Sequence, residues 1–360
     1  MKVSIILGTR PEIIKMSPVI RQLQSRSLDF YIIHTGQHYS YNMDKIFFDQ
    51  LHLPNPHYNL DVGSGTHGRQ TGLMLEKIED IFIKNTPDII LVQGDTNTVL
   101  AAALVASKMG IKIGHIEAGL RSFDRSMPEE TNRVITDHLS DYLFAPTEIA
   151  KNNLLHEGID DRSIFVCGNT VVDAVMQNLD ISKKDTQILE KYGISKNNYF
   201  LITAHRQENV DQKSKLIGII QGLKMLYEEY GIPILFPAHP RTQKNLHQFG
   251  IPIPDGTIMF DPPGYLEFLQ LEENAKLILT DSGGVQEESC ILGVPTVTLR
   301  ENTERPETIH IGANMIVGTD PNKIIQGVRT MILQQIKWIN PFGDGNAGKR
   351  IVDTIIEGKS

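Results

Sequence analysis

The stretch Leu277-Ile278-Leu279-Thr280-Asp281-Ser282-Gly283-Gly284-Val285-Gln286-Glu287-Glu288 begins as a short apolar strand, passes through a turn of small residues and continues as the start of a helix. The two glycines after Ser282 allow a ligand to approach the backbone, and the open amides of a helix's first turn suit a diphosphate. An ordinary strand-to-helix turn with acidic first-turn residues explains this stretch equally well. The rest of the chain must decide between these two interpretations.

Length and composition limit the classes of protein to which this turn can belong. The chain has 360 residues, which is too many for one ordinary core, so two domains are expected. A hydrophobic share of 40% and a charged share of 22% are typical of a globular protein. The net charge of -8 argues against a nucleic-acid partner.

The ends and the cysteines indicate no membrane segment and a reducing compartment. No run of 18 or more apolar residues occurs, and the apolar N-terminal run enters Gly8 directly, as a first strand does and a signal peptide does not. Cys167 and Cys290 stand beside apolar residues without metal-ligand spacing, so we expect buried thiols. A cytoplasmic protein without membrane contact fits these features.

The first half of the chain repeats one unit, an apolar strand followed by a loop and a helix. Strands that are apolar throughout and are separated by helices predict a parallel sheet covered on both faces. The expected strands are 3–7, 30–34, 89–93, 113–116, 142–145 and 164–166. The expected helices are 13–23, 69–83, 98–109, 129–139 and 147–156.

A more polar passage, 178–198, interrupts this rhythm before a second set of strands and helices begins. The expected strands there are 199–203, 234–238, 257–260, 277–280 and 296–299, with helices at 213–230, 265–274, 285–292 and 321–336. The fold class is therefore α/β, with two doubly wound Rossmann-like domains facing each other across a cleft. We place the first domain at residues 1–168 together with a returning C-terminal helix within 342–360, and the second at 169–341.

Polar clusters directly follow several of these strands, where ligands of doubly wound sheets bind. In the first domain these are Gly8 to Glu12 with Lys15, Gly94 to Thr98, and Glu117 to Ser122, and Met127 to Arg133 opens a helix. In the second they are Thr203 to Asn209, Pro237 to Arg241, Ser282 to Gly284, and Arg300 to Glu307. Acids such as Glu129 and Glu130 can merely complement a helix dipole, and His239 can be an ordinary loop histidine. The convergence of so many charged groups on strand ends favours a site.

No catalytic metal is expected from the histidine spacing. His34 and His38 are four residues apart, but they straddle a strand end and Gly36, so they do not form a zinc pair on one helix.

These clusters together resemble the non-hydrolysing UDP-N-acetylglucosamine 2-epimerases, and the likeness runs from Val3 nearly to the C-terminus. It is carried by Gly8-Thr9-Arg10-Pro11-Glu12 with Lys15, Gly94-Asp95-Thr96, His115 to Arg121, Pro128 to Arg133, His205 to Asn209, Asp281 to Glu288, and Thr303 to Glu307. The resemblance implies a glycosyltransferase-B-like fold, a homodimer, and interconversion of UDP-GlcNAc and UDP-ManNAc without a metal or nicotinamide cofactor.

The resemblance also implies roles for particular residues. Asp95, Glu117, Glu130 and His205 look like the catalytic set, with Lys15 and Arg133 as their supports. Arg10, His205, Ser282, Gly283, Gly284, Glu288 and Arg305 look like nucleotide ligands, with Phe268 near the uracil and His239 as a further substrate contact. Cleavage of the bond from C1 to the UDP oxygen makes the C2 proton removable and yields 2-acetamidoglucal, to which UDP adds back. Inversion at C2 needs proton carriers on two faces, which several carboxylates can supply.

Two departures from the family pattern bear on activation by a second UDP-GlcNAc and on substrate specificity. The region Gln37 to Met43 is longer than the Gln-His-Arg-x-Met stretch that helps bind an activating second UDP-GlcNAc in bacterial members, and it lacks that arginine. Relatives that act on UDP-diacetamido-glucuronic acids tend to have Ala-Arg-Pro-Gln where this chain has Thr9-Arg10-Pro11-Glu12. UDP-GlcNAc is thus the favoured substrate, with a UDP-diacetamido-uronic acid, a sugar transferase or a non-catalytic sensor as alternatives.

Overall fold

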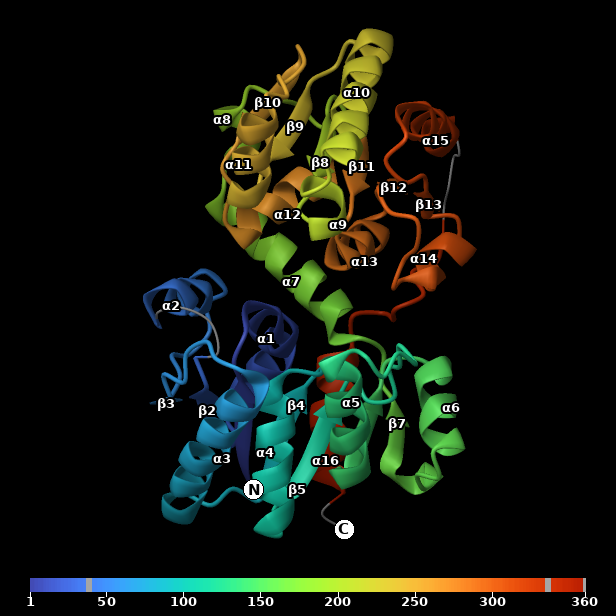
Figure 1. The fold of residues 1–360 in the computed structure, drawn as a ribbon. Coiled ribbons are helices and arrows are strands. Elements are labelled where there is room, and N and C mark those ends of the chain that lie inside the picture. Colours follow the sequence, from blue (N-terminus) through green and yellow to red (C-terminus); the bar gives the residue numbers. More distant parts are fainter. Residues whose placement is uncertain (37–40, 334–337, 359–360) are drawn as a thin grey trace. The chain divides into compact units, whose positions relative to one another are not determined.

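The computed structural model describes residues 1–36, 41–333 and 338–358 (Figure 1). It divides into two compact units, one of Met1–Gln177 with Phe342–Ser360 and the other of Asn178–Pro341. Both consist of a parallel sheet with helices between successive strands, and each unit is described here by itself.

Unit 1 contains a parallel sheet of seven strands within its described residues, in the order β3-β2-β1-β4-β5-β6-β7. The strands are β1 (Lys2–Leu7), β2 (Asp29–His34), β3 (Tyr58–Asn59), β4 (Ile89–Gln93), β5 (Lys112–Ile116), β6 (Tyr142–Ala145) and β7 (Ile164–Val166). The connecting elements are α1 (Arg10–Ser25), α2 (Tyr41–Gln50), α3 (His67–Lys84), α4 (Asn97–Lys108), α5 (Pro128–Leu139), α6 (Glu148–His156), the 3-10 turn η1 (Asp161–Ser163) and α7 (Thr170–Asp185).

The central strands of unit 1 are mainly apolar, as expected of a sheet that is covered on both faces. Ile6, Ile33 and Ile90 join one buried cluster with the apolar faces of α3 and α4. The C-terminal helix α16 (Ala347–Glu357) packs against α1. Its first amides are anchored by the buried Asp173, whose carboxylate accepts from the Gly348 amide at 2.9 Å. The chain therefore returns to unit 1 after completing unit 2 (Figure 1).

Unit 2 contains a parallel sheet of six strands, counted over its described residues, in the order β10-β9-β8-β11-β12-β13. The strands are β8 (Phe200–Thr203), β9 (Ile234–Pro237), β10 (Thr257–Phe260), β11 (Leu277–Thr280), β12 (Thr296–Thr298) and β13 (Asn314–Ile316). The helices are α8 (Ile188–Lys191), α9 (Gln207–Val210), α10 (Lys213–Tyr230), α11 (Pro240–Phe249), α12 (Tyr265–Asn274), α13 (Gly283–Leu292), α14 (Pro306–His310) and α15 (Pro321–Leu333).

Alternate residues of the unit 2 strands enter two different cores, as the period of a strand requires. Phe200 and Ile202 pack in one cluster with α10 and α15, whereas Leu201 lies between them in sequence and packs in the other cluster with α8, α12 and α13. A sheet buried on both faces explains why these strands contain no polar stripe.

The α/β fold class predicted from the sequence is confirmed, and the differences lie in short or polar elements. Residues 178–185, expected in a polar interruption, form the second half of α7, and the division between units falls inside this helix after Gln177 instead of after Gly168. The edge strands β3 and β13 and the helices α2, α7, α8, α9, α11 and α14 were not predicted. Both cysteines are buried free thiols, as expected. Within the described ranges, no helix is long and apolar enough to cross a membrane.

Each sheet has one position where the direction of strand addition reverses. In unit 1 it lies between β1 and β4, and in unit 2 between β8 and β11. Doubly wound sheets bind ligands outside the carboxyl ends of the strands at such positions. The loops after these four strands contain Arg10, Asp95, His205 and Ser282, so the topology brings predicted site residues to the edge where a ligand is expected.

Candidate active site

Glu117 follows β5 and is held by two side-chain donors in unit 1. Lys15 Nζ donates to Glu117 Oε1 at 2.6 Å, and Gln93 Nε2 donates to Glu117 Oε2 at 2.6 Å. The backbone of Glu117 has a φ of 68°, in the left-handed region that costs a non-glycine residue about 1–2 kcal/mol. Strain of this kind is stored where a side chain must be aimed at a particular point. Sequence analysis predicted Lys15 as the support of Glu117 but did not identify Gln93.

Arg133 joins two of the other predicted acids. On helix α5, its guanidinium donates to Glu130 Oε2 at 2.8 Å and to a carboxylate oxygen of Asp95, which follows β4. Asn132 Nδ2 also donates to the backbone carbonyl of Asp95 at 2.8 Å. One helix therefore fixes both the side chain and the backbone of the loop after β4.

Glu130 is held as a carboxylate by several donors. Its oxygens accept from the Ser122 amide and hydroxyl at 2.9 Å each and from the Phe123 amide at 3.0 Å. Burial by itself raises the pKa of Glu130, but the donors of Ser122, Phe123 and Arg133 outweigh it and hold the pKa below its ordinary value. Glu130 is thus an ionised group at neutral pH.

A buried ionic network connects β5 with α5. His115 on β5 contacts Asp137 through Nδ1 at 2.6 Å and the Gly94 carbonyl through Nε2 at 2.8 Å. Since both ring nitrogens face acceptors, the ring favours its doubly protonated form. Burial lowers the pKa of His115, but the charge and hydrogen bond of Asp137 raise it above the ordinary value. Arg121 completes the network with an ion pair to Asp137 at 2.7 Å. His115 and Arg121 are the first and last residues of one stretch that carries the family resemblance, but the sequence did not indicate that they form this network.

Arg10, at the start of α1, faces an aromatic ring. Its guanidinium carbon lies 5.0 Å from the ring centroid of Phe47 on α2, within the range of a cation–π contact. No pattern in the sequence indicated a role for Phe47. Residues 37–40, which belong to the stretch compared with the activator-binding segment, lie outside the described residues.

In unit 2, Asp281 orients His205. The buried Asp281 carboxylate accepts from the backbone amides of His205 and Arg206 at 3.0 Å and lies 3.1 Å from His205 Nδ1. Burial raises the pKa of Asp281, but the His205 and Arg206 donors outweigh it and lower the pKa below its ordinary value. An anion at Nδ1 favours a proton there and leaves Nε2, on a ring that is 43% exposed, as the nitrogen for a ligand. His239 is close, with ring centroids 6.5 Å apart, and its Nδ1 accepts from the Arg241 amide at the start of α11.

The Ser282-Gly283-Gly284 turn leads into α13 without side-chain capping. Ser282 is the N-cap residue, and its hydroxyl makes no cap hydrogen bond. A Cβ built on Gly284 has Ser282 Oγ, at 3.9 Å, as its nearest neighbour, and one on Gly283 has Glu304 at 3.6 Å. Neither glycine has a positive φ, so the folded backbone does not itself require glycine here. The missing side chains leave space beside open helix-terminal amides, which is what a bound diphosphate needs.

The remaining predicted residues of unit 2 surround this turn. Arg305 pairs through Nε with Glu287 Oε1 at 2.8 Å, and its guanidinium carbon is 3.9 Å from a Cβ built on Gly283. Phe268 on α12 packs in the same cluster as Val285 of α13. Glu288 influences the fully buried Glu272, whose pKa is raised well above its ordinary value first by burial and then by the Glu288 charge.

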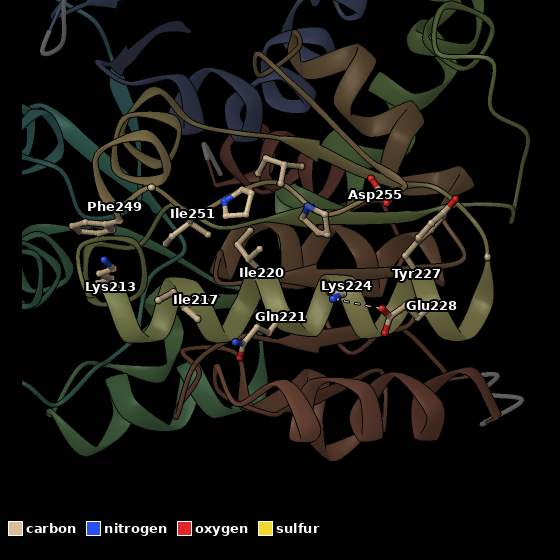
Figure 2. Close-up of a pocket in the computed structure, with 15 residues that line it drawn as sticks. Lys213, Ile217, Ile220, Gln221, Lys224, Tyr227, Glu228, Phe249, Ile251 and Asp255 are labelled. Atoms are coloured by element: carbon tan, nitrogen blue, oxygen red, sulfur yellow. Dashed lines mark ion pairs between the residues drawn. The ribbon is translucent and has the colours of Figure 1, made fainter.

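A separate cavity of about 930 Å³ lies between α10 and the segment after α11 (Figure 2). Its walls are mainly apolar side chains such as Ile217, Phe249 and Ile251, with Lys224 paired to Glu228 at 3.8 Å on α10. None of the predicted site residues lines it. The switch-point edges, which carry the predicted site residues, are therefore the candidates for the active site.

Comparisons with known proteins identify the family. A family model described as UDP-N-acetylglucosamine 2-epimerase matches residues 21–356. A UDP-N-acetylglucosamine 2-epimerase of Methanocaldococcus jannaschii is 58% identical, covering 100% of each chain. A UDP-2,3-diacetamido-2,3-dideoxy-D-glucuronate 2-epimerase of Pseudomonas aeruginosa is 42% identical, covering 98% of this chain and 99% of that one.

Solved structures give the same result for the fold. The crystal structure of the M. jannaschii UDP-GlcNAc 2-epimerase in complex with UDP-GlcNAc and UDP has a TM-score of 0.86 at 58% identity, covering 99% of this chain and 100% of that chain. A lipopolysaccharide outer core galactosyltransferase, 15% identical with a TM-score of 0.58, shares the fold alone. The architecture is thus glycosyltransferase-B-like. With a matching family model over most of its length and relatives aligned from end to end, this chain belongs to the UDP-N-acetylglucosamine 2-epimerase family.

Proposed function

We propose that the protein interconverts UDP-N-acetylglucosamine and UDP-N-acetylmannosamine by inverting C2 of the sugar. The observation that carries the proposal is the set of three carboxylates, Asp95, Glu117 and Glu130, each held by a cationic side chain at the carboxyl edge of one sheet. Three fixed acids are more than nucleotide binding requires, and inversion needs proton carriers on two faces of C2. Family membership and the substrates of the relatives support the sugar.

The reaction begins with departure of UDP. The C1–O bond breaks with its electron pair leaving on UDP, a carboxylate takes the proton from C2, and a C1=C2 double bond forms in 2-acetamidoglucal. The open amides around Ser282 to Gly284, together with Arg10 and Arg305, stabilise the negative charge on the leaving diphosphate. Preorganised donors of this kind contribute about 3 kcal/mol each to the transition state.

The second half reverses these bonds on the other face. An acid donates a proton to C2 from the opposite side, and the UDP oxygen returns to C1. Atoms and electrons balance without an oxidant, so nicotinamide is not needed. Asp95, Glu117, Glu130 and His205 form the proposed catalytic set, with Lys15 and Arg133 holding the acids in place. Unit 1 thus supplies the proton chemistry.

Unit 2 is assigned to the nucleotide. His205, Ser282, Gly283, Gly284, Glu288 and Arg305 hold UDP in this proposal, with Glu288 on the ribose, Phe268 near the uracil and His239 as a further contact. The family resemblance supports a homodimer. The two buried free thiols support a reducing compartment such as the cytoplasm. Light scattering of the purified protein tests the dimer, and a monomer mass would exclude it.

Deuterium incorporation tests the proposed reaction. The protein is incubated with UDP-GlcNAc in D2O, and both sugars are examined by NMR and mass spectrometry. We expect deuterium at C2 of both epimers, because the proton that leaves exchanges with solvent before another is delivered. Recovery of unlabelled UDP-GlcNAc with no UDP-ManNAc would exclude epimerase activity.

Substitution of Glu117 by Gln tests the division of roles. The amide keeps the size of the side chain but cannot accept the C2 proton, so epimerisation should be lost while the Kd for UDP stays within about threefold of wild type. The matched control is Glu148→Gln, which changes an acid in the first turn of α6 away from the switch point. A large loss of UDP affinity in Glu117→Gln would show that the proton role is misassigned.

A UDP-diacetamido-uronic acid is the second candidate substrate, because the P. aeruginosa relative with that activity is 42% identical. The same deuterium assay with this sugar decides between the two. If kcat/KM is larger for the uronic acid, then the uronic acid and not UDP-GlcNAc is the preferred substrate, and the reaction is still a 2-epimerisation.

A further inference from the structure

Glu12 is a fully buried acid at the switch point of unit 1 to which the reaction above assigns no step. It lies in the first turn of α1, and its side chain is only 2% exposed. Glu12 Oε2 accepts from the Gly8 amide at 3.0 Å and from the Thr9 hydroxyl at 2.7 Å. Its other oxygen, Oε1, accepts from the Thr96 hydroxyl at 2.9 Å. One carboxylate therefore connects the loop after β1 with the loop after β4.

Each of these loops carries a residue of the proposed site. Arg10 adjoins Thr9, and Asp95 adjoins Thr96, so each hydroxyl that donates to Glu12 is one residue from a site side chain. Thr96 is also the N-cap of α4, where its hydroxyl accepts from the Val99 amide at 3.4 Å. Its single hydroxyl thus donates to Glu12 and accepts from the helix at once, which fixes its rotamer.

The surroundings give this connection little room to shift. A Cβ on Gly8 would come within 2.2 Å of Thr35 Oγ1 and 2.4 Å of Thr98 Oγ1, so the loop after β1 is packed against its neighbours. These three donors to Glu12 are neutral groups, whereas the other acids of the site pair with the cations Lys15 and Arg133. The charged side chains at the same switch point include Arg10 and Lys15 on α1, Asp95 after β4 and Glu117 after β5.

We propose that Glu12 is a positioning residue that holds the Arg10 loop and the Asp95 loop in register for the reaction. This inference rests on the proposed function, because it assumes that Arg10 receives the leaving diphosphate and that Asp95 carries a proton. Burial supports a proton-dependent form of the connection: it raises the pKa of Glu12 from 4.5 to about 7 against the opposing effect of the Thr9 and Thr96 hydroxyls. A protonated Glu12 reverses the bond to Thr96 and donates to its hydroxyl.

Glutamine and leucine substitutions at position 12 test the proposal. Glu12→Gln imitates the protonated acid, since its carbonyl accepts from Gly8 and Thr9 while its amide donates to Thr96. We expect kcat within about threefold of wild type and loss of the ionisation near pH 7 from the kcat profile. Glu12→Leu removes both connections and should lower kcat on the order of tenfold or more, the equivalent of one hydrogen bond to a charged group, with little change in KM. Wild-type kcat and an unchanged pH profile in both variants would overturn the proposal.

A threonine pair separates positioning from helix capping and covers the case in which Glu12→Leu fails to fold. Thr96→Val removes the bond to Glu12 and the cap of α4, while Thr147→Val removes an equivalent cap, which accepts from the Ala150 amide at 3.2 Å on α6. Both variants should lose similar stability, but only Thr96→Val should lower kcat about tenfold. Equal kcat values in the two would overturn the positioning role.

Hydrogen exchange keeps this test independent of the substrate assignment. Peptides covering residues 8–12 and 94–98 should exchange faster in Glu12→Leu than in Glu12→Gln, whatever sugar the enzyme uses. If the wild-type protein performs no epimerisation, the proposed function fails, but the exchange rates still test whether Glu12 connects the two loops. Unchanged exchange of both segments in Glu12→Leu would refute that connection.

Discussion

Replacing Asp137 by Asn should destabilise unit 1 strongly and in a pH-dependent way. The Asp137 carboxylate on α5 is 0% exposed and contacts His115 Nδ1 at 2.6 Å, Arg121 at 2.7 Å and the Gly119 amide at 3.1 Å. The Asn side chain keeps the shape but removes the charge. His115 and Arg121 are then left buried without this carboxylate, although Arg121 Nε still pairs with Glu157 Oε1 at 2.7 Å.

The expected magnitude follows from breaking a buried ion pair on one side. Such a change costs about 3–5 kcal/mol, because an uncompensated charge stays buried. Since the pKa of His115 is raised in the folded protein, the stabilisation it gains is fully present below the unfolded pKa of 6.5 and is lost as pH rises through the folded pKa. Asp137→Asn removes that gain. The difference in unfolding free energy from wild type should therefore be larger at pH 6 than at pH 9.

The assay must report unit 1 in particular. The chain has one tryptophan, Trp338, whose indole donates to the Cys290 carbonyl at 2.8 Å within unit 2. Its fluorescence is thus an internal control for the other unit. Urea unfolding followed by hydrogen exchange of the β5 and α5 peptides measures the affected region, at pH 6, 7.5 and 9.

Two results would refute this reasoning. A loss below about 1 kcal/mol at all three pH values would mean that the network contributes no more than an exposed ion pair. A loss that grows from pH 6 to pH 9 would mean that His115 is not the titrating partner. The tryptophan midpoint should stay near its wild-type value, because Trp338 and Asp137 belong to different units.

Three further outcomes follow from the same structure. Gly284→Ala should leave stability unchanged or higher, because the added methyl meets nothing closer than 3.9 Å and alanine favours helix by about 1 kcal/mol, yet calorimetry should show a weaker UDP affinity. The unfolding free energy of the wild type should fall by roughly 2.5 kcal/mol from pH 5 to pH 8 in urea titrations, because the pKa of Glu12 rises from 4.5 in the unfolded chain to about 7 in the folded protein. Glu12→Gln has no such ionisation, so its unfolding free energy should rise relative to wild type by this amount over the same pH range. Lys15→Met removes the 2.6 Å partner of Glu117 and should lower kcat at least tenfold, while the UDP Kd measured by calorimetry stays near wild type.

Many elements of this fold could be predicted because their apolar residues form a clear pattern. β4, β6, β7, β10, β11, α10 and α12 have the predicted bounds. β4 and β11 are buried at every position and are therefore uninterrupted apolar or nearly apolar runs. Helix α7 was not predicted, because its second half, residues 178–185, is rich in polar residues and was interpreted as an interruption between the domains. β3 and β13 are short and each contains an asparagine, whereas the equally short β7 is an uninterrupted apolar run, Ile164 to Val166.

Candidate site residues could be selected from the sequence, but the contacts between their side chains could not be predicted. Residues just after strands could be selected because the carboxyl ends of parallel strands meet at one edge. The partner of each acid depends on side-chain reach across elements: Arg133 meets Asp95 from 38 positions away, and Gln93 meets Glu117 from 24. No local pattern in the sequence encodes such distances, so the scaffolding roles of Gln93, His115 and Phe47 emerged only from the fold.

Pairing with cations makes a carboxylate a weaker base, although the proposed reaction needs a carboxylate that removes a proton from C2. The proposed order of steps accounts for this difference. The donors around Glu130 hold its pKa below the ordinary value, so it is always ionised but is a weak base. A weak base cannot remove an ordinary sugar C2 proton at a useful rate. Once UDP has begun to leave, positive charge at C1 makes that proton acidic, and a weak, fixed carboxylate suffices. In the proposed mechanism, a weakly basic Glu130 therefore fits elimination led by the leaving group better than direct deprotonation, and it gives the donors that receive the diphosphate more importance than the strength of this base.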